Sequence, residues 1–270
     1  MTKLAGRPGG AADALTQGQT RGVIRVMFRF YAELNDLLPE HRAQQTSVLE
    51  LPLPTTVGDA IESLGVPHTE ADVIVVNGDS VGFDRLLADG DRVAVYPVFE
   101  AIDVSPIVHL RPEPLRDVRF VADVHLGKLA RLLRLCGFDC RYRNDFDDDE
   151  LVDISLAERR VLLTKDRGLL KRRAVTHGCL VHNQDPFEQA VEIVRRLDLA
   201  GSIEPFTRCL ACNGMLDDTD KEAVLSRLPP AVEQDHERFS RCRDCGRVYW
   251  PGSHHERLEA IVDRLRSYLG

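Results

Sequence analysis

Four of the seven cysteines in this chain form two Cys-x-x-Cys pairs. Cys209 pairs with Cys212 and Cys242 with Cys245, and 29 residues separate the pairs. Two such pairs are typical of a tetrahedral Zn²⁺ site with four thiolate ligands and no open coordination position. One pair alone would equally fit a redox disulfide, but two favour structural zinc. In so short a segment the metal is expected to supply folding free energy on the order of 10 kcal/mol.

The gap between the cysteine pairs is longer than the roughly 15–20 residues of a compact zinc ribbon. We expect residues 218–228 to form an inserted helix that accounts for the excess. Tyr249 and Trp250 follow the second pair. Two roles remain open for them: stacking on nucleic-acid bases, or packing the ribbon against its neighbour.

Acidic residues follow three apolar segments in the second half of the chain. Asp123, Asp166 and Asp185 each come after such a segment, and helical patterns lie between them. In an open parallel sheet, ligands bind beyond the carboxyl ends of the strands, so we expect these acids to share one edge. Carboxylates suit Mg²⁺ or Mn²⁺, and two ions about 4 Å apart can activate water and stabilise the leaving oxygen of a phosphodiester. The alternative is that each aspartate only caps the following helix.

A fourth group of acids, residues 147–150, begins a helix. We favour Asp149 and Glu150 as further metal ligands, although an acidic first turn also stabilises a helix without any metal. Basic residues surround the predicted site: Lys128 and Arg131 follow Asp123 in sequence, and Lys165 and Arg167 flank Asp166. They are candidates for RNA phosphate contacts, with a solvated helix face as the alternative.

The elements that would position these residues alternate between strand and helix. After an apolar segment at 117–122 come a helical pattern closed by Gly137 and a helix over 147–158. A buried strand ending near Asp166, a short helix, another strand and a helix beginning at Pro186 follow. This order predicts an α/β, doubly wound parallel sheet. Cys136, Cys140 and Cys179 fall within the predicted elements and are expected to be buried as small apolar residues.

The first hundred residues have a different pattern. Strands over 23–30 and 48–53, a short helix over 60–65, and strands over 73–78 and 91–98 follow a β-grasp order. We therefore divide the chain into a disordered tail (1–20), a β-grasp domain (21–101), an extended linker (102–116), a nuclease core (117–205), and a zinc ribbon with a C-terminal helix (206–270).

Residues 76–100, VNGDSVGFDRLLADGDRVAVYPVFE, resemble the small sulfur carriers that are related to ubiquitin. Those carriers need a free Gly-Gly carboxyl terminus, whereas this chain continues through Phe99-Glu100-Ala101. The resemblance therefore implies a ubiquitin-like fold without carrier chemistry, and we expect the domain to dock a protein partner.

Three later segments, RFVADVHLGKLARLLRLCGFD, NDFDDDELVDIS and VLLTKDRGLLKRR, resemble the PIN-like ribonuclease domain named after the carboxy-terminal part of the Mut-seven exonuclease. The resemblance implies RNA as substrate and acids that hold Mg²⁺ or Mn²⁺. As metal-binding acids of the family, the resemblance implies Asp123 and Asp166 most directly and the acids at 148–150 next. It implies Asp185 as the fourth acid of the site. The same family has a zinc ribbon after its nuclease core, and residues 245–258 resemble it.

Charge and hydropathy limit the remaining function classes. The net charge of −8 argues against coating nucleic acid by bulk positive charge, but residues 1–100 carry −6 of it. No apolar stretch approaches the roughly 20 residues of a membrane span, and we expect a cytoplasmic protein that binds no membrane. The leading hypothesis is a metal-dependent ribonuclease, and the alternative is a non-catalytic adaptor for RNA or protein. A phosphatase is disfavoured because Asp123-Val-His lacks the second aspartate of a nucleophile pair. The sequence leaves the oligomeric state open.

Overall fold

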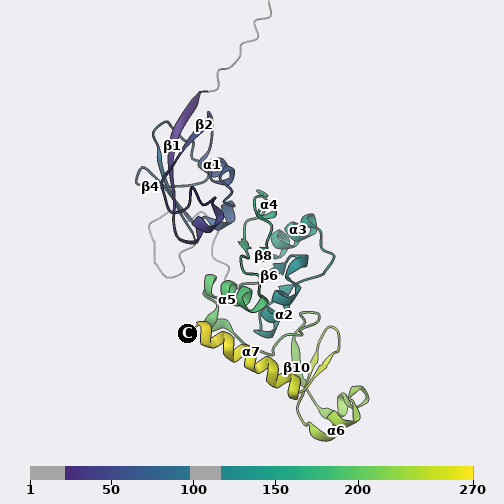
Figure 1. The fold of residues 1–270 in the computed structure, drawn as a ribbon. Coiled ribbons are helices and arrows are strands. Elements are labelled where there is room, and N and C mark those ends of the chain that lie inside the picture. The colour runs from purple at the N-terminus through teal and green to yellow at the C-terminus, as the bar shows by residue number, and fades with distance from the viewer. Residues whose placement is uncertain (1–21, 98–116, 270) are drawn as a thin grey trace, which may run out of the picture.

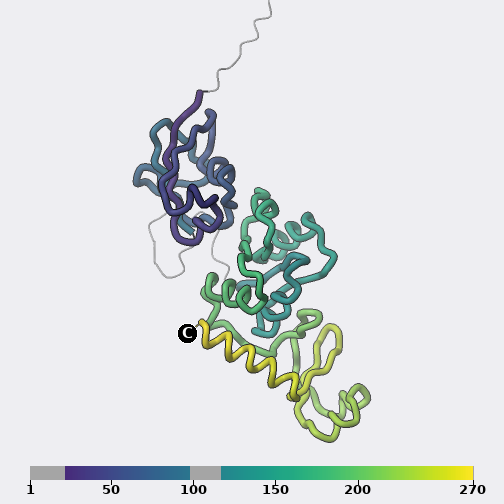
Figure 2. Tube along the Cα trace, in the orientation of Figure 1, coloured from purple at the N-terminus to yellow at the C-terminus, as the bar shows by residue number. Residues whose placement is uncertain are grey.

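The computed structural model describes residues 22–97 and 117–269, which contain three β-sheets. The predicted tail (1–20) and linker (102–116) lie outside the described residues. Figures 1 and 2 show the β-grasp sheet at one end of the molecule, the parallel sheet in the middle and the small cysteine-bearing sheet at the other end.

The N-terminal sheet has the mixed topology of a β-grasp fold. Its strand order is β2-β1-β5-β3-β4, with β1 and β5 parallel and the other neighbours antiparallel. The elements are β1 (Val23–Phe30), η1 (Ala32–Leu37), β2 (Ser47–Pro52), α1 (Val57–Ser63), η2 (His68–Glu70), β3 (Val73–Val76), β4 (Asp79–Val81) and β5 (Arg92–Tyr96).

Alternating apolar residues build the core of this domain. In β1 the even-numbered residues from Ile24 to Phe30 are buried, as expected when a strand covers a core with one face. Helix α1 packs Val57, Ala60 and Ile61 into the same core, and the side chain of Thr56 caps its first turn by accepting from the Asp59 amide. The predicted β-grasp fold is confirmed, with β4 as a strand that the pattern did not reveal.

The central sheet consists of four parallel strands in the order β7-β6-β8-β9. Its strands are β6 (Phe120–Ala122), β7 (Cys140–Arg141), β8 (Val161–Thr164) and β9 (Gly178–Leu180). Its helices are α2 (Gly127–Leu135), α3 (Asp148–Glu158), α4 (Arg167–Leu170) and α5 (Pro186–Arg196).

Helices cover both faces of this sheet. Phe120 and Ala122 of β6 lie in one apolar cluster with α2 and α5, whereas Val121 between them lies in a second cluster with α3 and α4. This alternation places the two layers on opposite faces. The predicted doubly wound parallel sheet is confirmed.

The β-grasp domain packs directly on the α3–α4 side of the central sheet. The apolar cluster that contains the β-grasp core continues into Leu169 and Leu170 of α4 and into Leu180 of β9. At the contact, Glu70 is only 1% exposed. Its carboxylate accepts a hydrogen bond from the Leu180 amide at 2.9 Å and forms an ion pair with Arg196 of α5. A buried, paired glutamate fixes the two domains against each other.

The C-terminal region is a three-stranded antiparallel sheet followed by a long helix. Its elements are β10 (Leu216–Thr219), η5 (Lys221–Ala223), η6 (Leu225–Arg227), α6 (Pro230–Asp235), β11 (Phe239–Cys242), β12 (Val248–Tyr249) and α7 (Ser253–Leu269). The inserted helix predicted over 218–228 is wrong. The first residues of this segment belong to β10, and most of the others form the two short 3-10 turns η5 and η6. Pro229 and Pro230 follow at once and stop any helix from extending through them.

Helix α7 connects the cysteine-bearing sheet back to the central sheet region. It begins beside β12 and ends next to α5, where the Arg195 guanidinium donates to the Tyr268 carbonyl at 2.6 Å. Val262 and Leu265 of α7 are buried in the cluster of α2 and α5. None of the helices among the described residues has the length and apolar character that crossing a bilayer would require.

Candidate functional site

Asp123 and Asp166 lie at the carboxyl edge of the central sheet. Asp123 directly follows β6, and Asp166 follows β8, the neighbouring strand. From β6 the chain crosses to β7 on one side and then returns to β8 on the other side. The strand order therefore reverses between β6 and β8, and open α/β sheets bind their ligands at such a point.

Thr164, the last residue of β8, connects the two aspartates. Its hydroxyl donates to Asp123 Oδ2 at 2.6 Å and accepts from the Asp166 amide at 3.0 Å. The Asp123 amide in turn donates to the Leu163 carbonyl at 3.0 Å. Because Thr164 is fully buried, this arrangement holds the Asp123 carboxylate and the start of the Asp166 turn in fixed positions.

The prediction that Asp185 directly follows a strand is wrong, because β9 ends at Leu180, but each of the three aspartates caps the helical turn that follows it. Oδ1 of Asp123 accepts from the His125 amide at 3.3 Å, and Oδ1 of Asp166 accepts from the Gly168 amide at 2.7 Å. Oδ1 of Asp185 accepts from the amides of Phe187 and Glu188 at 2.9 and 3.2 Å. Capping occupies Oδ1 alone. In the described part of the chain, Oδ2 of Asp166 and of Asp185 accepts no hydrogen bond, and no Lys or Arg nitrogen lies within 4 Å of any of the three carboxylates.

The helix-start acids have a different environment. Asp147 and Glu150 form a capping box at the start of α3. Glu150 also forms an ion pair with Arg143 at 3.3 Å. Asp148 and Asp149 both pair with Arg172, at 3.3 and 2.5 Å. Metal binding by Asp149 and Glu150 stays a prediction, and it would have to compete with these arginines.

The predicted acids do not form a closed ligand cluster. Within residues 22–97 and 117–269, the four cysteines are the one group of three or more candidate ligand residues whose donor atoms all lie within 4.8 Å of one another. Asp123 and Asp166 lie on neighbouring strands of one sheet edge, but no third acid among the described residues joins them in a cluster that meets this limit.

Of the four predicted RNA contacts, Lys128 and Arg131 on α2 are exposed and have no ion-pair partner among the described residues. The Lys165 ammonium donates to Gln184 at 2.8 Å. Arg167 donates to the Leu37 carbonyl of the β-grasp domain at 2.9 Å, so its guanidinium is an interdomain contact. Sequence pattern could not reveal this bond, because its two residues are 130 positions apart.

The four cysteines converge as their spacing predicted. The Sγ atoms of Cys209 and Cys245 lie 3.7 Å apart, and those of Cys212 and Cys242 lie 3.4 Å apart. A tetrahedral site with Zn–S bonds of about 2.3 Å requires sulfur atoms about 3.8 Å apart. The separations and the thiolate donor set therefore fit a four-coordinate metal.

Two cysteines of the cluster differ in acidity. Burial opposes ionisation of Cys209, but the Tyr249 hydroxyl at 3.1 Å and the amides of Cys212 and Ala211 outweigh it and lower the thiol pKa to about 6. Burial and the neighbouring sulfurs raise the pKa of Cys212 to about 12. Without a cation the cluster therefore favours few thiolates, and a bound metal would remove that penalty.

The first cysteine pair is attached to the central sheet region by polar side chains. Arg134 of α2, only 4% exposed, donates to the carbonyls of Leu210 and Ala211 at 3.3 and 3.0 Å. Asn213 accepts from the Cys140 amide at 2.9 Å and donates to Asp139 at 2.7 Å. Sequence reasoning missed these residues, whose only signal was Asn213 directly after Cys212.

Comparison with known proteins gives a consistent result for both parts of the chain. The family model described as "Mut7-C RNAse domain" matches residues 118–262, and the one described as "Mut7-C ubiquitin" matches residues 23–103. No curated protein matches the sequence.

Several solved structures are similar to about a quarter of the chain. A putative molybdopterin converting factor, subunit 1, from Pyrococcus furiosus is 31% identical; the match covers 27% of this chain and 97% of that one, with a TM-score of 0.22. Two structures of small archaeal modifier protein 1 from Haloferax volcanii are 19% and 18% identical. They match 27% and 28% of this chain and 97% and 98% of their own, with TM-scores of 0.23 and 0.24.

Proposed function

Because the chain belongs to the Mut7-C RNAse domain family, with a Mut7-C ubiquitin-like domain before it, we propose that it hydrolyses RNA phosphodiester bonds with Mg²⁺ or Mn²⁺. One observation carries the choice of site: Asp123 and Asp166 are joined through Thr164 at the point where the strand order reverses. Neither carboxylate has a basic partner in the described residues. Asp123 is also 8% exposed, and a buried carboxylate without counter-charge is costly unless a cation binds it.

The roles follow from these positions. Asp123 and Asp166 would hold the ion, Asp185 would add a third carboxylate, and Asp149 and Glu150 would contribute only by releasing their arginines. A bound Mg²⁺ or Mn²⁺ supplies an acidified water and stabilises the charge on the leaving oxygen. Thr164 orients the Asp123 carboxylate, while Lys128 and Arg131 attract the RNA phosphates to the edge.

We assign structural Zn²⁺ to Cys209, Cys212, Cys242 and Cys245, because four thiolates leave no open position for chemistry. All seven cysteines are free, which suits the reducing conditions of the cytoplasm. Elemental analysis of protein purified without chelator should give about one zinc per chain. Chain without bound metal, or with bound iron in its place, would contradict the assignment.

The nuclease proposal is tested with labelled single-stranded RNA, Mn²⁺ or Mg²⁺, and the variants Asp123→Asn and Asp166→Asn. Asparagine caps a helix as well as aspartate, so the turns should survive while the negative charge is lost. We expect cleavage to fall by at least about a hundredfold, equivalent to about 3 kcal/mol. The matched control is Asp153→Asn, an exposed aspartate on α3, which should cleave like wild type. Equal cleavage by all four proteins, or none by wild type, would refute the proposal.

A second candidate is a non-catalytic RNA-binding adaptor. It is favoured by the capping bonds at Asp123, Asp166 and Asp185, which give each carboxylate a structural role without metal. The same experiment separates the two functions, since an adaptor would bind the RNA and leave it intact with either cation.

A further inference from the structure

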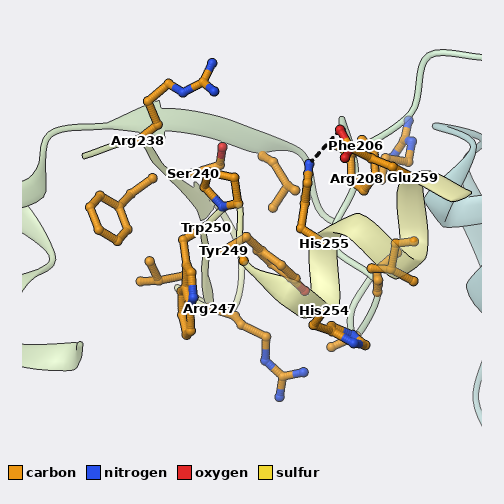
Figure 3. Close-up of a pocket in the computed structure, with 18 of the residues that line it drawn as sticks. Phe206, Arg208, Arg238, Ser240, Arg247, Tyr249, Trp250, His254, His255 and Glu259 are labelled. Carbon is orange, nitrogen blue, oxygen red and sulfur yellow. Dashed lines mark ion pairs between the residues drawn. The ribbon is translucent and has the colours of Figure 1, made fainter. Parts of the chain in front are cut away.

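A groove runs between the small antiparallel sheet and the start of α7. Its volume is about 730 Å³, within the range of small-ligand sites. Arginines and aromatic residues line it, as Figure 3 shows. This groove lies outside the carboxyl edge to which the nuclease proposal assigns catalysis.

Three arginines of the groove have no acidic partner. Arg131, Arg238 and Arg247 are exposed, and no carboxylate among the described residues comes within 4 Å of their guanidinium nitrogens. Asp218 also lines the groove, and its carboxylate accepts from the Ser240 hydroxyl at 3.4 Å without an ion-pair partner among the described residues. Arg208 contacts Asp139 at 3.6 Å, and His255 contacts Glu259 at 3.3 Å. Three arginines without acidic partners against one such carboxylate leave the groove with an excess of positive charge, in a chain whose net charge is −8.

Two aromatic residues of the groove are adjacent in sequence, directly after the second cysteine pair. The Tyr249 hydroxyl is hydrogen-bonded to Cys209 Sγ at 3.1 Å, so the cysteine cluster holds this ring in place. Trp250 is partly exposed and is the single tryptophan of the chain. A fixed aromatic surface beside unpaired arginines is the combination that binds single-stranded nucleic acid, because bases stack on the rings and phosphates pair with the cations.

Helix α2 connects the groove with the carboxyl edge. It begins four residues after Asp123, and Arg131 on this helix lines the groove. Lys128 lies three positions before Arg131, so both basic side chains project from the same side of α2. Positive charge therefore extends from the predicted metal site to the groove along one short helix.

We propose that this groove binds a single-stranded segment of the RNA substrate, with bases on Trp250 and Tyr249 and phosphates on Arg131, Arg238 and Arg247. The identity of the ligand rests on the proposed ribonuclease function. Base stacking on protein side chains requires exposed base faces, which a duplex hides. The groove therefore favours single strands over duplex RNA.

Trp250 allows a direct test that needs no cleavage. The Asp123→Asn variant of the full chain is titrated with a single-stranded RNA oligonucleotide while tryptophan fluorescence is recorded. We expect saturable quenching that weakens with salt, little quenching by duplex RNA of the same length, and none by heparin, a polyanion without bases. Equal quenching by heparin, or tighter binding of polyglutamate than of RNA, would overturn the proposal.

Substitutions locate the binding site. In the same background, Trp250→Leu should weaken binding of labelled RNA about tenfold, measured by fluorescence anisotropy. Arg247→Gln should weaken it severalfold with a shallower salt dependence. Arg257→Gln, an exposed arginine of α7 that does not line the groove, should bind like the parent. Zinc content and circular dichroism of each variant establish that it is folded.

The two proposals fail in different ways. If Trp250→Leu and Arg247→Gln bind RNA as the parent does, the groove proposal is wrong whether or not the wild type cleaves RNA. If wild type binds RNA through the groove but leaves it intact with Mg²⁺ and Mn²⁺, the nuclease proposal is wrong and the groove remains.

Discussion

The central parallel sheet is joined to its two neighbours by different sets of contacts. On the β-grasp side, apolar side chains form one continuous cluster, and the buried pair of Glu70 and Arg196 crosses it. On the side of the cysteine cluster, Arg134 donates to the Leu210 and Ala211 carbonyls and Asn213 accepts from the Cys140 amide, while α7 adds apolar packing against α2 and α5.

The two contacts therefore depend on different conditions. The β-grasp contact consists of residues that pack without a cofactor. The polar contact requires the Leu210 and Ala211 carbonyls to stay where the first cysteine pair places them, so it is only as stable as the metal site. If the cysteines hold zinc as proposed, its loss should loosen one side of the central sheet and leave the other side intact.

The largest effect is expected from removing a metal ligand. Cys242→Ser should unfold the antiparallel sheet, because bound zinc supplies folding free energy on the order of 10 kcal/mol. Hydrogen exchange should rise over residues 207–250 and stay unchanged over 23–96, since the β-grasp core lies in the other apolar cluster. The control Cys136→Ala removes a buried thiol that belongs to no pair, and it should keep its zinc. Faster exchange in both regions of Cys242→Ser would contradict the comparison.

The second largest effect is expected from Glu70→Ala. It leaves Arg196 nearly buried and without its partner, which typically costs about 3–5 kcal/mol. Hydrogen exchange should rise at the Leu180 amide and along the β-grasp contact, while zinc content stays the same. Glu62→Gln, at a more exposed position of the same interface, should cost less than about 1 kcal/mol. Similar losses from both substitutions would show that burial of the Glu70 pair is not the cause.

Acid should lower the free energy of unfolding by about 3 kcal/mol, and α5 should transmit this loss to both contacts of the central sheet. Burial opposes ionisation of Glu192, yet hydrogen bonds from His182 and Asn183 outweigh it and lower the Glu192 pKa to about 2. The ionised carboxylate therefore stabilises the fold above about pH 4.5, and this stability is lost as the pH falls towards 2. Because α5 carries Arg195 and Arg196, acid should weaken both contacts together. Chemical denaturation of Glu192→Gln should give lower stability at pH 7 and a flatter dependence between pH 4.5 and 2.

The smallest effect is expected from Arg173→Ala. Its ion pair with Asp59 crosses the β-grasp interface at 3.4 Å, but the Arg173 side chain is 90% exposed. Solvent and salt screen such pairs, so the free energy of unfolding should change by less than about 0.5 kcal/mol. A loss comparable to that of Glu70→Ala in the same denaturation experiment would mean that surface charge holds the domains together.

Local patterns in the sequence predicted the elements and the residues at their ends. The apolar, β-rich segment of β1, the cysteine spacing and the aspartates after β6 and β8 were all visible because each depends on near neighbours in the chain. The inserted helix over 218–228 was inferred from the length of the gap between the cysteine pairs, which does not determine secondary structure, and Asp218 and Thr219 instead pair with β11.

Long-range polar contacts were not visible in the same way. Glu70 lies in a polar stretch, PHTEAD, that resembles an exposed loop, and only the fold buries it against a residue 126 positions away. Arg167 was expected to contact RNA from its position beside Asp166, but it bonds to Leu37. Periodicity shows which face of an element is apolar, and it does not show which element will cover that face.

The contact between Glu70 and Arg196 joins two parts of one polypeptide. Its formation therefore costs no translational entropy of association, and the tether keeps the two surfaces at an effective concentration that can reach the millimolar range. An interface that would be weak between separate proteins can thus remain closed nearly all the time. The side of the β-grasp domain that carries Glu70 is, in this chain, covered by another part of the same polypeptide.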